Sequence, residues 1–132
     1  MAKEKSILSS AELIAELLED DPRVKALGAS FFPIIAPEKV GCPYIVYRIG
    51  KLFTRADSVG HADTGQIEVI CCGASYRQMV EISEATRMAL DGVRATSDDG
   101  SLVMRSCVLT GASEGYESQT FVRTLIFTVK IN

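Results

Sequence analysis

The stretch Phe121–Ile131, FVRTLIFTVKI, decides the class of fold. Its residues alternate, so that one side carries Phe121, Arg123, Leu125, Phe127, Val129 and Ile131. The other side carries mostly polar residues, among them Thr120, Thr124, Thr128 and Lys130. Because successive side chains of a strand point to opposite faces, this period of two predicts a strand with one face in the core. Such a pattern is typical of antiparallel sheets that are covered on one side.

Four further stretches are predicted as strands. Phe31–Ile35 is rich in β-formers but contains Pro33, which cannot donate to a ladder, so we expect a short edge strand. Tyr44–Ile49 is almost continuously apolar, which predicts cover on both faces. Gln66–Cys71 alternates polar and apolar residues. Leu102–Leu109 is the last of the four, and we expect turns at 96–100 and 111–118 around it.

Three helices are expected between these strands. Ser9-Ser10-Ala11-Glu12 fits a capping box, with Ser9 at the N-cap and Leu8 in the staple position, before a helix whose inward residues are Leu13, Ile14, Leu17 and Leu18. Asp21-Pro22 predicts a short helix that ends at Gly28. Ser75-Tyr76-Arg77-Gln78 is a second capping box, and the helix behind it turns Met79, Ile82, Thr86, Ala89 and Val93 inward.

This order of elements predicts an α+β fold, with a largely antiparallel sheet and two main helices packed on one face. We expect residues 1–132 to form a single domain, with 1–8 as a flexible extension. At 47% hydrophobic and 23% charged residues, the composition is that of a globular protein and excludes a disordered one.

Charge and hydropathy narrow the classes of partner. The 14 Lys and Arg residues are scattered, and 17 Asp and Glu outnumber them, so we expect no nucleic-acid specificity. No apolar run approaches the roughly 18 residues of a membrane helix, and the first residues do not resemble a signal peptide. We therefore expect a protein that folds in the cytoplasm and has no membrane partner.

No catalytic, metal or cofactor site is expected. The cysteines Cys42, Cys71, Cys72 and Cys107 form no C-x-x-C pair, and we interpret them as reduced residues of the core. His61, the single histidine, has no visible partners for catalysis. An enzymatic function would require the fold to bring His61 close to Cys71 or Cys72.

A succession of short motifs carries a family resemblance. Phe32-Pro33-Ile34-Ile35-Ala36-Pro37 precedes Pro43-Tyr44-Ile45-Val46-Tyr47, and Gln66–Cys71 leads through Ala74–Tyr76 into a helix that ends Met88-Ala89-Leu90-Asp91-Gly92. In this order, from about Ala11 to the final strand, the chain resembles the tail-completion, or tail-terminator, proteins of long-tailed bacteriophages and prophages. The adjacent Cys71 and Cys72, Cys42 and residues 1–8 depart from that pattern.

The resemblance implies a structural protein of virion assembly that catalyses nothing. Such subunits form a ring, typically a hexamer, that ends the tail tube and joins it to the head. The implied partners are other copies of the chain, the tail-tube protein and the head connector. The implied location is the bacterial cytoplasm during assembly and then the tail or neck of the virion.

The irregular arm from Lys51 to Gly65 carries charges of both signs. It supplies the self-association candidates Lys51, Arg55, Asp57, His61 and Asp63, and complementary pairing between copies would use them. A merely solvated loop explains the same residues. The alternative function is a small ligand-binding or regulatory α+β domain with a pocket between helix and sheet.

Overall fold

A computed structural model describes residues 5–53 and 63–131 of the chain. Its helical elements are a 3-10 turn at Ile7–Ser9 and three α-helices, α1 (Ser10–Asp20), α2 (Pro22–Leu27) and α3 (Tyr76–Leu90). Its strands are β1 (Ser30–Pro33), β2 (Tyr44–Phe53), β3 (Asp63–Gly73), β4 (Ala95–Thr96), β5 (Val103–Glu117) and β6 (Thr120–Ile131). None of these helices is long and apolar enough to cross a membrane.

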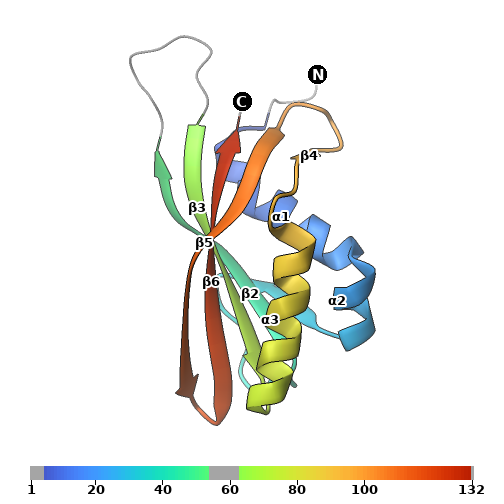
Figure 1. Cartoon of the computed structure of the whole chain (residues 1–132), viewed down its shortest axis with the longest axis vertical. Coiled ribbons are helices and arrows are strands. Elements are labelled where there is room, and N and C mark those ends of the chain that lie inside the picture. Colours follow the sequence, from blue (N-terminus) through green and yellow to red (C-terminus); the bar gives the residue numbers. More distant parts are fainter. Residues whose placement is uncertain (1–4, 54–62, 132) are drawn as a thin grey trace.

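The strands form one sheet in the order β1-β2-β3-β6-β5-β4. The four central strands pair antiparallel, and only β1 runs parallel to its neighbour β2. All three helices lie on the same side of the sheet, as Figure 1 shows. The predicted α+β fold with a largely antiparallel sheet is therefore confirmed.

The core lies between this sheet and the helices. The predicted inward face of β6 is buried from Leu125 to Ile131, and Phe127 is the largest of the fully buried side chains. From the helices, fully buried Ile14, Leu18 and Ile82 pack against it. Consecutive residues of β2, Ile45 and Val46, are both buried, so this strand is covered on both faces there, as its apolar sequence predicts.

Two of the three predicted helix starts are confirmed by their caps. The Asp21 carboxylate accepts from the backbone N–H groups of Arg23 and Val24, and the Ser75 hydroxyl accepts from Gln78 N at 3.1 Å. At α1, Ser9 is the N-cap residue as predicted, but the capping box is not formed, because a 3-10 turn capped by Ser6 precedes the helix and the Ser9 side chain makes no capping bond.

The residues before α1 pack against the body. Leu8 does not act as a staple, since it is 72% exposed, and Ile7 is buried in its place. The backbone N–H of Lys5 donates to Ser101 Oγ at 2.7 Å. The residues from Lys5 to Leu8 are thus held beside the turn that follows β4.

The turn expected at 111–118 is also wrong. β5 continues to Glu117 and pairs with β6 to the end, and the chain reverses in two residues, Ser118 and Gln119, whose φ angles are 47° and 63°. Positive φ at both central residues is what a tight type I′ hairpin requires. A β-bulge between Leu109 and Gly111 shifts the register, so the alternation of β5 changes face at that point.

Candidate functional site

The predicted charged arm is only partly described. Lys51 is an exposed residue of β2, and Asp63 is the first residue of β3, so the ends of this arm are the tips of two long strands. Arg55, Asp57 and His61 lie outside the described residues. The structure therefore does not test whether this arm mediates contacts between copies, which stays a prediction.

The cysteines are not placed as activated nucleophiles. Cys71 and Cys72 are both buried, and the Cys71 thiol lies 3.6 Å from Thr86 Oγ1 on α3. Burial raises the pKa of Cys71 and of Cys107 to about 12 and that of Cys72 to about 11, so these thiols stay protonated at neutral pH. Within the described residues, no three His, Cys, Asp or Glu side chains gather as metal ligands would.

The outer half of the β5–β6 hairpin is a candidate contact surface, because its residues on β5 and the outer edge of that strand are exposed. It lies at the end of the sheet opposite the start of β3, because Gly73 pairs with Phe121 near the hairpin turn and Asp63 pairs with Ile131 (Figure 1). The residues of β5 from Ala112 to Glu117 are all exposed. Beyond Val103 and Met104, which pair with β4, the outer edge of β5 has no neighbouring strand in the described sheet.

A polar cluster ties this hairpin to α3. Arg123 of β6 donates to Glu114 Oε2 at 2.8 Å and to Ser83 Oγ on α3 at 3.1 Å. The Tyr76 hydroxyl, from the first residue of α3, donates to the same carboxylate at 3.1 and 3.2 Å. The hydrogen bonds from Arg123 and then Tyr76 hold the pKa of Glu114 below its ordinary value, so Glu114 is an anion at neutral pH. The cluster fixes the direction of the hairpin relative to α3.

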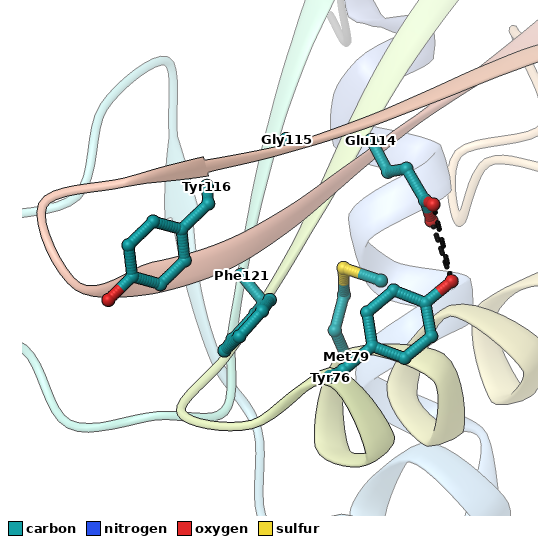
Figure 2. A pocket seen from close by; sticks show the side chains of 6 residues that line it. All are labelled: Tyr76, Met79, Glu114, Gly115, Tyr116 and Phe121. Carbon is teal, nitrogen blue, oxygen red and sulfur yellow. Dashed lines mark hydrogen bonds between the residues drawn. The ribbon is translucent and has the colours of Figure 1, made fainter.

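Next to this cluster lies an apolar hollow of about 310 Å³. Figure 2 shows its apolar lining, Tyr116 and Phe121 from the hairpin and Tyr76 and Met79 from α3. The rings meet edge to face: Tyr116 and Phe121 have centroids 4.8 Å apart, and Tyr76 and Phe121 6.2 Å apart. Tyr116 is nevertheless 59% exposed and Tyr76 49% exposed, which is unusual for aromatic residues in contact. We call these four residues the aromatic hollow.

A second exposed apolar group follows β1. Ile34 and Ile35 are 67% and 75% exposed, the latter more than any other large apolar residue of the described chain. They border a hollow of about 380 Å³ on the sheet face away from the helices, where Tyr44, Val46 and Val122 also lie. We call Ile34 and Ile35 the isoleucine knob.

Sequence reasoning missed both features. The knob stands between Pro33 and Pro37 in a stretch read as strand and turn, and two adjacent isoleucines outside a buried strand were the available signal. Tyr116 stands in a glycine-rich stretch that was read as a turn. Its contact with Phe121 depends on a strand pairing that local sequence does not reveal.

The ligand-binding alternative predicts a pocket between helix and sheet. The centre of that interface is filled by fully buried side chains, among them Ile82, Leu90, Val69 and Phe127, and the aromatic hollow lies at its end, between α3 and the hairpin. The aromatic hollow and the hollow beside the knob both open at the surface, where a partner protein would reach them.

Comparison with known proteins shows a likeness in fold. The chain is similar to a chain in the solved structure titled "Virion of native gene transfer agent (GTA) particle", with a TM-score of 0.74 and 14% sequence identity over 96% of this chain and 98% of that chain. No protein-family model matches the sequence, and no curated protein matches it. At the level of the fold, the resemblance to virion proteins is confirmed: the chain folds like a component of a gene transfer agent particle.

Proposed function

We propose that this protein is a structural component of a phage or phage-like virion. The observation that carries the proposal is the shared fold, which extends over nearly the whole length of both this chain and the virion chain.

Within the virion, we infer a ring-forming subunit of the tail-terminator type. The family resemblance in the sequence motifs supports this role, and so do two exposed apolar features at different places on the chain. A ring requires heterologous contacts, in which one patch of a subunit meets a different patch of its neighbour. Its partners would be other copies in a hexamer, the tail-tube protein and the head connector. It would assemble in the bacterial cytoplasm and remain in the tail or neck.

The charged arm is a second proposed contact. Lys51, Arg55, Asp57, His61 and Asp63 carry both signs, so neighbouring copies can pair them. We expect Arg55→Glu or Asp57→Lys to weaken assembly and to leave the free energy of unfolding within about 0.5 kcal/mol of wild type, because the proposal makes the arm a contact between copies and not part of the core. Assembly is measured by mass photometry and folding by urea unfolding. Loss of folding would show that the arm is part of the core.

Ring formation is tested directly on the full chain. Native mass spectrometry across a concentration series, with negative-stain images, should show a closed oligomer, either alone or after addition of tail tubes, because some rings close only on a tube end. Binding of labelled protein to tube ends is the second readout. A protein that stays monomeric and also fails to bind tube ends is not a tail terminator. A tight small-molecule ligand for a stable monomer, found by thermal-shift screening, would favour the ligand-binding alternative.

A further inference from the structure

The isoleucine knob is held by a strained turn. Ile35 N donates to Pro33 O at 2.7 Å, which closes a three-residue γ-turn around Ile34. Ile34 has a φ of 67°, a value that β-branched residues rarely adopt, and the γ-turn with positive φ is the rare and strained form. Ile34 N donates to Tyr47 O at 2.9 Å, so the turn is anchored to β2.

Burial of the two isoleucine side chains among the described residues offsets little of the cost of this turn. Glycine would adopt the same angles without strain, whereas Ile34 and Ile35 gain little burial, at 67% and 75% exposure. Strained backbone that holds exposed apolar side chains is a pattern found at binding sites, where the side chains are buried by a partner. The knob therefore indicates a contact that is made only in an assembly.

We propose that the isoleucine knob of one copy inserts into the aromatic hollow of the next copy. The inference rests on the proposed ring and names one of its contacts. The knob borders the hollow on the sheet face away from the helices, together with Glu117, Ser118 and Thr120 of the hairpin end. The aromatic hollow lies between the hairpin and α3, and the knob is not among the residues that line it within the same chain. A head-to-tail neighbour brings the two together.

Size and charge favour a second copy as the occupant. A hollow of about 310 Å³ has the volume of roughly ten water molecules, which is suited to two aliphatic side chains. Exposed Glu38 and Lys39 follow the knob on the same connection. Exposed Arg77 directly follows Tyr76 of the hollow, and Glu114, whose side chain is 48% exposed, lines it. Opposite charges on the two rims can pair in one register around an apolar centre, as at ordinary interfaces.

The decisive variant is Ile34→Gly in the full chain, because it separates assembly from folding. It removes the strain and half of the knob, so the melting temperature should be unchanged or higher while self-association weakens about tenfold or more, as expected for loss of an interface anchor. Leu8→Ser is the matched control, since Leu8 is 72% exposed and is not among the residues that line the aromatic hollow or the hollow beside the knob. It should leave association unchanged. The proposal is wrong if Ile34→Gly forms rings as stable as those of the wild type. It is also wrong if Ile34→Gly and Leu8→Ser weaken self-association equally.

Cross-linking identifies the contact itself. In a Cys42→Ser background, Ile35→Cys and Tyr116→Cys should form a disulfide dimer only when the two variants are mixed, and one chain carrying both should give a ladder of oligomers. An Ile35→Cys variant that cross-links to itself would indicate a two-fold contact, and one that cross-links to tail-tube protein would assign the knob to that partner; either result refutes the proposal. If Ile34→Gly still forms rings, the proposed contact between knob and hollow is refuted, but the proposed ring is not. If wild-type protein neither associates nor binds tube ends, the ring fails as well.

Discussion

Gly73, the last residue of β3, lies directly against the first turn of α3. A Cβ atom added there would lie 2.5 Å from the backbone N of Met79, 3.0 Å from its Cα and 3.1 Å from the carbonyl carbon of Gln78. Non-bonded carbon atoms pack best at roughly 3.5–4.0 Å, so the first turn of α3 would have to move by about 1 Å. The obstructing atoms belong to backbone and cannot rotate away. Gly73→Ala should therefore strain the junction between β3 and α3.

The expected cost is that of overpacking, about 1–3 kcal/mol. For a chain of this length each kcal/mol lowers the melting temperature by about 4 °C, so we expect a decrease of about 4–12 °C. Urea unfolding followed by circular dichroism measures the free energy, and calorimetry the melting temperature. Because the shift would also displace Tyr76 at the start of α3, the variant should weaken any association that uses the aromatic hollow.

Gly115→Ala is the matched control. Gly115 has no heavy atom within 4 Å of an added Cβ and does not have a positive φ, so alanine should leave stability within about 0.5 kcal/mol of wild type. If Gly73→Ala is as stable as Gly115→Ala, the close approach of β3 to α3 is not a constraint, and the reasoning about this junction is refuted.

Three further predictions concern stability, pH and thiol chemistry. Phe127 is fully buried, so Phe127→Ala should cost about 3–5 kcal/mol in urea unfolding and Phe127→Leu much less. Hydrogen bonds from Ser97 and Ser101 lower the pKa of Asp99 to about 2. Because the folded pKa lies below the ordinary value of 3.8, this stabilisation is complete above pH 3.8 and is lost as the pH falls toward 2; Asp99→Asn should abolish that part of the pH dependence. Iodoacetamide at pH 8 should modify half-buried Cys42 first and reach Cys71 only on unfolding, which peptide mass spectrometry checks, and a fast reaction at native Cys71 would contradict its raised pKa.

The parts of the fold that sequence reasoning predicted are those in which local chemistry and tertiary packing agree. The alternation in β6 survives because its apolar face is the one that meets the helices, with Leu125, Phe127 and Val129 all buried. Asp21 before Pro22 caps α2, since a carboxylate there satisfies helix N–H groups whatever the tertiary context. These signals act over a few residues and can be read directly.

The features that were missed depend on partners far along the chain. Gly111, Ser113 and Gly115 have low strand propensity, yet they pair with Ile126, Thr124 and Val122 of β6, and that pairing decides their conformation. The parallel pairing of β1 with β2 has no local signal either. Ile34 is a stronger case, because its left-handed conformation opposes the preference of its residue type, so no rule based on preference could have found it.

The two missed features are each held in place by hydrogen bonds within the chain, and this rigidity bears on assembly. The aromatic hollow is built from α3 and the hairpin, and the bonds among Tyr76, Glu114 and Arg123 lock these elements together before any partner arrives. The knob is fixed by two backbone hydrogen bonds and by Pro33, whose ring restricts φ. Rigid surfaces lose little conformational entropy on binding, so a small apolar contact between them contributes more of its burial energy to association. In the proposed ring, many identical contacts would multiply that gain, so that hollows and knobs of this modest size would suffice, whereas a monomeric ligand-binding domain would need one deep pocket.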